Sequence, residues 1–265
     1  MSCSRVAHSN LKEKVQRNNY ISGNNLFNTI IMEDLQVPVQ TVGSLSQDRQ
    51  ATFYRKTYTH VALAVLLFIV VETIYFQIPA LLEFALSLTQ GWTWLLLLGG
   101  FMFITNYAEK MALQSTDTNK QYLALALYVI AEAFIFVPLI FMAMYYAEDG
   151  AFEILNQAAV LTLSLFTGLS AIVLLTKKDF SFLKSILTVG FFIALGLIIA
   201  GVAFGFNLGL WFSVGMVILA AGAILYQTSN LVHKYREDQY VAAGLGLFAS
   251  LMLLFWYILS ILSRD

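Results

Sequence analysis

Residues 122–146 read YLALALYVIAEAFIFVPLIFMAMYY, and this run carries a single formal charge, at Glu132. About 20 apolar residues in a helix cross about 30 Å of hydrocarbon, because each residue adds about 1.5 Å. The run is too continuously apolar for a strand of a membrane β-barrel. Because a backbone in lipid must satisfy its own hydrogen bonds, the sequence predicts a membrane-spanning helix here.

Six further apolar runs of similar length surround this one. The seven expected spans are residues 59–79, 91–108, 122–146, 154–176, 185–206, 208–230 and 240–262. The chain of 265 residues is 59% hydrophobic and 12% charged, whereas soluble chains carry about 25% charged residues. The sequence therefore predicts an all-α fold, a polytopic membrane protein built as a seven-transmembrane-helix bundle.

Residues 1–58 differ in composition from the rest of the chain. They hold seven Lys or Arg and four Asp or Glu, and they lack sustained apolar periodicity. Such a segment cannot bury enough apolar surface to fold alone. We expect a disordered cytoplasmic tail over residues 1–58 and a seven-helix transmembrane domain over residues 59–265.

The positions of the basic residues predict the orientation in the membrane. The connections after the first, third and fifth spans hold no Lys or Arg, so fourteen of the fifteen basic residues fall on one side and only Arg264 is opposed. Because cytoplasmic segments carry an excess of Lys and Arg, the amino terminus is expected in the cytoplasm and the carboxyl terminus outside.

Several classes of function are disfavoured. One cysteine and three widely separated histidines argue against a disulfide framework and a zinc site. A net charge of −1 gives the protein no strong positive electrostatic potential that would attract nucleic acid. Phosphate-binding loops and His-Glu-x-x-His motifs are missing from the sequence. We therefore expect no enzyme, no cofactor, no metal site and no nucleic-acid partner.

Two acids, Glu72 and Glu132, lie clearly inside expected spans. A carboxylate near the bilayer centre costs about 2.5–3.5 kcal/mol on insertion scales, so such residues commonly have a function. One interpretation is a proton-sensing or cation-binding group that faces a water-filled interior. The other is a protonated acid that hydrogen-bonds to a neighbouring helix. The residues leave both interpretations open.

Four stretches resemble a known family of membrane proteins. They are FYRKTY at 53–58, TKKDFSFL at 176–183, GAILYQTSNLVH at 222–233 and SRD at 263–265. Together these stretches resemble the Bax inhibitor family, also called the transmembrane Bax inhibitor motif family. Their sequences are most similar to the bacterial YccA-like branch of that family. The similarity covers about residues 53–265, and the region of the sixth and seventh spans is its most specific part.

The resemblance implies a bundle with the last helix at its centre. For the YccA-like branch it also implies restraint of the membrane-bound AAA protease FtsH, in the bacterial cytoplasmic (inner) membrane. In other members it implies a pH-sensitive calcium leak, governed by acids on the sixth and seventh spans. By the match of motifs those acids fall at Gln227 and Ser250 here, and neither side chain ionises.

The function expected from these observations is that of a membrane regulator. The preferred hypothesis is an integral membrane protein that binds and modulates a membrane-bound AAA protease in membrane protein quality control. The alternative is a pH-sensitive leak channel or transporter for calcium or another cation, in which pH sensing would rest mainly on Glu132 or Glu72. The expected partners are the lipid bilayer, the protease and, in the alternative, calcium ions.

Overall fold

The computed structural model describes residues 40–146 and 151–264 of the chain. The chain divides into two units, residues 1–40 and 41–265. All helices of the described residues belong to the second unit. The disorder expected for residues 1–39 falls outside the described residues and stays a prediction.

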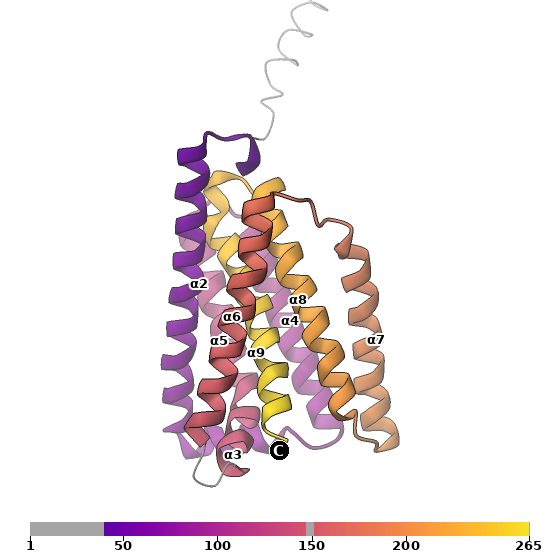
Figure 1. Ribbon diagram of the computed structural model, residues 1–265. Coiled ribbons are helices and arrows are strands. Elements are labelled where there is room, and N and C mark those ends of the chain that lie inside the picture. Colours follow the sequence, from indigo (N-terminus) through magenta and orange to yellow (C-terminus); the bar gives the residue numbers. More distant parts are fainter. Residues whose placement is uncertain (1–39, 147–150, 265) are drawn as a thin grey trace, which may run out of the picture. The chain divides into compact units, whose positions relative to one another are not determined.

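The described residues of the second unit contain seven long helices and no strand (Figure 1). The long helices are α2 (Gln47–Phe76), α4 (Trp92–Gln114), α5 (Thr118–Tyr146), α6 (Ala151–Thr176), α7 (Leu183–Phe204), α8 (Gly209–His233) and α9 (Tyr240–Leu262). The short ones are the 3₁₀ turns η1 (Val42–Ser44) and η2 (Glu237–Gln239) and the helix α3 (Pro79–Ser87). The predicted all-α polytopic fold is confirmed.

The second span differs in shape from the other six. Six of the long helices are long and apolar enough to cross a membrane on their own, whereas α4 reaches this standard only together with α3. These two helices meet at an angle of 109°. Pro79 opens α3, where its missing N–H costs nothing, and Gly91 adopts a φ of +56° just before α4. The bent pair counted as one span gives the predicted number of seven.

Helix α9 lies at the centre of the bundle, as predicted. It packs against α2, α4, α5, α6 and α8, and 14 of its residues are buried. Small residues on α9 permit this close packing. A Cβ atom on Gly244 would lie 3.1 Å from the Cβ atom of His60 on α2, which is tighter than ordinary contact.

The first long helix begins earlier than the sequence analysis predicts. Residues 1–58 were expected to form a tail, but α2 begins at Gln47. The first turns of α2 carry polar residues on their exposed side, so the composition of this segment does not predict a helix. Gln50, Phe53 and Thr57 are nevertheless buried, and they follow the three- and four-residue spacing of a helix face.

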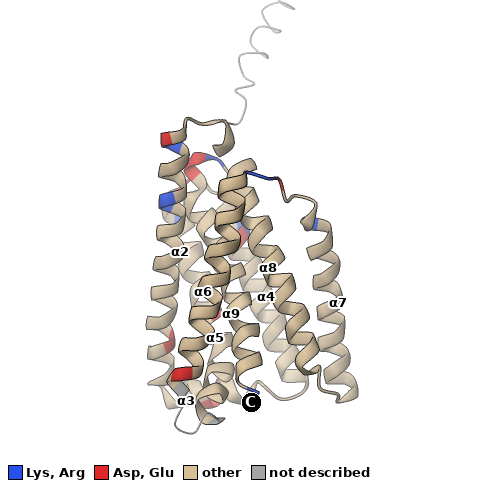
Figure 2. Cartoon of the chain, viewed as in Figure 1, with Lys and Arg blue, Asp and Glu red and all other residues tan. Residues whose placement is uncertain are grey.

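The charged residues mark the two ends of the bundle. Lys and Arg gather at the end where α2 begins and where α6 and α8 finish (Figure 2). We call this the basic end. Arg264 lies at the opposite end, where its guanidinium is 3.5 Å from the hydroxyl of Ser213 near the start of α8. This distribution agrees with the alternation of basic connections in the sequence.

Candidate functional site

Glu132 lies on α5 inside the bundle. It is only 5% exposed, and its Oε2 atom has no hydrogen-bond partner among the described residues. One helical turn earlier, Tyr128 packs edge-to-face against Phe248 of α9, with ring centroids 6.2 Å apart. The carboxyl group therefore faces the tightly packed centre of the molecule.

A second acid, Glu109, lies near Glu132. It belongs to α4, which packs against α5, and its partly buried carboxyl group lies close enough for an electrostatic interaction with Glu132 and Tyr128. Two carboxylates that share such a region repel each other when both are ionised. This arrangement places a carboxyl pair on α4 and α5.

Glu109 lies just beyond the second expected span, which ends at residue 108. Helix α4 continues to Gln114, so Glu109 belongs to the helix rather than to the connection that follows it. The signal that could have found it is the helical spacing of Thr105, Ala108 and Ala112, which are buried. These residues carry the interior face of α4 past the expected boundary.

Glu72 lies on α2 in a different environment. It is 6% exposed, and neither carboxyl oxygen has a hydrogen-bond partner among the described residues. It lines a cavity of about 630 Å³ between α2, α5, α6 and α9. Glu132 is not among the lining residues, so the structure does not bring the two predicted acids into one site.

Gln227 of α8 and Ser250 of α9 each contact Gly246 of α9. A Cβ atom on Gly246 would lie 3.2 Å from Oε1 of Gln227. The Ser250 hydroxyl donates a hydrogen bond of 3.0 Å to the carbonyl oxygen of Gly246. Neither side chain changes its charge with pH, so this contact provides packing and hydrogen bonds without a proton-driven switch.

A polar network fixes residues 42–50 at the basic end. The backbone N–H of Val42 donates to the Tyr235 carbonyl oxygen at 2.9 Å. Nε2 of Gln50 donates to the Leu45 carbonyl oxygen at 2.8 Å, and Nζ of Lys177 donates to Oε1 of Gln50 at 3.3 Å. We call residues 42–50 the clasp, because they join the start of α2 to the ends of α6 and α8.

The clasp has two further attachments. Arg49 forms an ion pair with Glu237 in η2. A Cβ atom on Gly43 would lie 2.7 Å from the Val232 carbonyl oxygen, so this position accepts only glycine without a shift of the backbone. Both side chains of this ion pair are exposed, so solvent screens their attraction, and the backbone contacts of Val42 and Gly43 hold the clasp in place.

The described residues offer no ready metal site. They contain no group of three or more His, Cys, Asp or Glu residues placed to hold a metal ion. Calcium normally binds six to eight oxygen atoms. The Glu109–Glu132 pair supplies too few ligands for tight calcium binding by itself.

Comparison with known proteins gives a family match over most of the chain. The family model described as "Inhibitor of apoptosis-promoting Bax1" matches residues 50–265. The chain is 38% identical over 119 residues to an uncharacterised protein of Pseudomonas aeruginosa, covering 44% of this chain and 53% of that protein. It is 36% identical over 124 residues to the "Modulator of FtsH protease YccA" of Escherichia coli, covering 45% of this chain and 56% of that protein.

A viral protein also shows similarity. The chain is 30% identical over 115 residues to the "Golgi anti-apoptotic protein" of vaccinia virus, covering 42% of this chain and 47% of the viral protein. The chain thus spans about half the length of the curated relatives it matches.

Proposed function

The chain belongs to the Bax inhibitor family, and from this membership we propose that it is a membrane regulator that binds and restrains a membrane-bound AAA protease of the FtsH type. The observation that carries the proposal is the 36% identity to a protein named as a modulator of that protease. The expected setting is membrane protein quality control, and we propose no catalytic activity for the chain itself.

The clasp supports this proposal. Proteases attack exposed, disordered ends of a chain most readily. The composition of residues 1–39 predicts such an end, while the contacts of Val42, Gly43 and Gln50 fix the segment that follows. In this proposal the protease engages the tail, and the clasp and the tightly packed helices resist extraction. The protein would then occupy the protease without being rapidly degraded.

The neutral contact between α8 and α9 also favours regulation by binding. A leak gated by protonation needs an ionisable group at the gate, and Gln227 and Ser250 provide none. The close packing of Gln227 against Gly246 favours a stable pair of helices α8 and α9.

The experiment that tests the proposal is crosslinking in cells followed by purification of the tagged protein. We expect the purified material to contain the membrane AAA protease. A deletion strain should degrade the membrane substrates of that protease faster than the parent strain. Absence of the protease, together with normal substrate turnover in the deletion strain, would reject the proposal.

We place the protein in the bacterial cytoplasmic (inner) membrane, with its basic end and amino terminus in the cytoplasm. The support is the concentration of Lys and Arg at one end of the bundle (Figure 2). The carboxyl terminus would then lie on the outer side. Reporter fusions at the two ends test this orientation, and activity of both reporters in one compartment would contradict it.

The alternative function is a cation leak through the bundle. The observation that favours it is the buried Glu132 with the partly buried Glu109 of the neighbouring helix, which could take over proton sensing from the missing acids at Gln227 and Ser250. Purified protein in liposomes, assayed for calcium flux across pH, tests it. The alternative requires a calcium flux that Glu132→Gln abolishes. Absence of calcium flux at every pH would rule the alternative out.

A further inference from the structure

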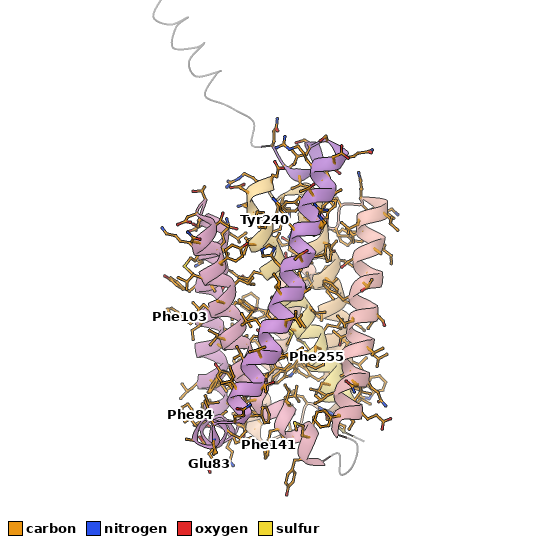
Figure 3. The ribbon with its side chains drawn as sticks, turned by 90° about the vertical axis from the view of Figure 1, so that its left-hand side faces the viewer. Glu83, Phe84, Phe103, Phe141, Tyr240 and Phe255 are labelled. Atoms are coloured by element: carbon orange, nitrogen blue, oxygen red, sulfur yellow. The ribbon has the colours of Figure 1, made fainter. Side chains whose placement is uncertain are left out.

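The cavity beside Glu72 has the size and lining of a ligand site that the proposed function does not use. Its volume of about 630 Å³ is within the usual range of about 300–1,000 Å³ for small-molecule sites. The lining is mainly apolar and includes Phe68, Ile140, Leu251 and Phe255. Figure 3 shows Phe255 between α2 and α6, in the half of the bundle away from the basic end.

The Glu72 carboxyl group is unusual within this lining. It is 6% exposed, and both of its oxygen atoms lack a hydrogen-bond partner among the described residues. Burying a polar group without a partner is unfavourable, and structures usually avoid it. An unpaired carboxyl group that lines a cavity points to a ligand that supplies its missing hydrogen-bond partners.

Thr162 of α6 adds a second unpaired group to the same cavity. It is 2% exposed, and its hydroxyl has no partner among the described residues. Threonine in a helix commonly donates to the carbonyl four residues earlier, as Thr73 does to Ile69 and Thr176 does to Ile172. Because Thr162 does not make this bond, its hydroxyl remains available to a molecule in the cavity.

The cavity reaches the outer surface of the bundle between α2 and α6. Three of its lining residues, Ile69, Phe152 and Leu163, are at least half exposed, although they are large and apolar. In a membrane such side chains face hydrocarbon. A ligand with an aliphatic chain can therefore enter sideways and place its polar end at Glu72.

We propose that this cavity binds a primary ammonium group carried on an aliphatic chain, with Glu72 and Thr162 as its hydrogen-bond acceptors. A primary ammonium has three N–H donors, and the two lining residues Glu72 and Thr162 carry three buried oxygen atoms that have no hydrogen-bond partner among the described residues. The positive charge matches the carboxylate, and the apolar lining receives the chain. Calcium fits poorly, since it seeks six to eight oxygens.

This ligand chemistry occurs in two sources, the headgroup of an aminophospholipid and a free long-chain amine. A quaternary choline headgroup has no N–H donor and is excluded by the same argument. The site is independent of protease binding, so its failure would leave the proposed function intact.

The test uses the full chain in nanodiscs of phosphatidylcholine, with a dodecylamine that carries a photoreactive diazirine on its chain. Crosslinks mapped by mass spectrometry should fall on α2 and α6 around Ile69 and Leu163. Unlabelled dodecylamine should compete and dodecanol should not, because dodecanol lacks the charge. Competition by phosphatidylethanolamine in the disc identifies the lipid as the source, and competition by dodecylamine alone identifies the free amine.

Variants of the two acceptors separate this site from a purely apolar groove. Since hydrogen bonds to a charged group are the stronger ones, Glu72→Gln should raise the half-saturating concentration of the amine about tenfold or more. Thr162→Val should raise it several-fold, and it keeps the test decisive should Glu72→Gln aggregate. Glu153→Gln is the matched control, because Glu153 is exposed on α6 and bonds to Gln157.

Two results would overturn the proposal. One is equal competition by dodecanol and dodecylamine, which would make the cavity a groove for any aliphatic chain. The other is labelling at the wild-type level in both Glu72→Gln and Thr162→Val, which would show that the carboxyl and hydroxyl groups do not contribute to binding.

Discussion

Glu72, Glu109 and Glu132 are acids that the bundle keeps among apolar side chains. Among the described residues, none of them forms a salt bridge with Lys, Arg or His. Glu72 and Glu132 were predictable as acids within membrane spans, because single acids in long apolar runs stand out. Glu109 was missed because it stands beside Lys110 at the edge of a run, where the hydropathy falls before the helix ends. The roles of Glu72 and Glu132 in sensing remain predictions.

The first prediction concerns the stability contributed by Glu132. Its unpaired Oε2 atom and the nearby charge of Glu109 make the native state less stable than a neutral side chain would. We expect Glu132→Gln to raise the free energy of unfolding by about 1 kcal/mol. Chemical denaturation in detergent micelles measures this, with the exposed Glu83→Gln as the control. A loss of stability in Glu132→Gln would mean that a partner holds the carboxylate.

The second prediction concerns the connection between α6 and α7. Hydrogen bonds from Ser181, including its backbone N–H at 2.8 Å, lower the pKa of Asp179 from its ordinary value of 3.8. A lowered carboxyl pKa contributes stability that is present above the ordinary value and lost as the pH falls through the lowered one. We expect an NMR titration of labelled aspartate to give Asp179 a midpoint below 3.8. A midpoint at or above that value would contradict the loop geometry.

At the scale of elements, the apolar runs predicted the long helices well. The expected span 240–262 coincides with α9, and 154–176 differs from α6 only at its first residues. Length and hydropathy suffice for such helices, because lipid forces the backbone to bond within itself. The start of α2 and the bend at α3 could not be predicted in this way. They depend on the clasp contacts and on the backbone at Pro79 and Gly91.

The contact between α2 and α9 gives the third prediction. A Cβ atom on Gly244 would press on His60 and on the Thr57 carbonyl oxygen at 3.3 Å. We expect Gly244→Ala to lower the free energy of unfolding by about 1–3 kcal/mol through overpacking. Gly215→Ala on α8 is the control, because a Cβ atom there would meet no atom of a neighbouring helix within 4 Å. Equal stability of the two variants in detergent would show that α2 and α9 are less closely packed.

The clasp gives the fourth prediction. Because a side chain on Gly43 would meet a backbone carbonyl at 2.7 Å, Gly43→Ala should detach residues 42–50 from the end of α8. We expect limited proteolysis near residue 45 to become several-fold faster than in wild type, since cleavage follows the population of the open segment. Gly99→Ala, with open space around it, should leave the rate unchanged. Unchanged cleavage in Gly43→Ala would refute the anchoring of the clasp.

At the scale of the whole molecule, composition alone identified a membrane protein. A chain with 12% charged residues has too few charged side chains to cover a surface that faces water. Large apolar side chains such as Leu96, Phe103 and Ile218 are exposed on the bundle. Figure 3 shows Phe103 on the outer side, whereas Phe255 lies within the molecule. The partner cannot be read from this surface, because the face toward lipid and a face toward another membrane protein have the same apolar chemistry.

We propose that this protein restrains a membrane AAA protease. The most direct measurement is the degradation rate of a membrane substrate by the purified protease in proteoliposomes, with and without the full chain. The account predicts that degradation slows as the chain approaches the molar amount of protease, and that Gly43→Ala restrains it less because the chain is itself degraded faster. An unchanged degradation rate at a molar excess of the chain would contradict the account.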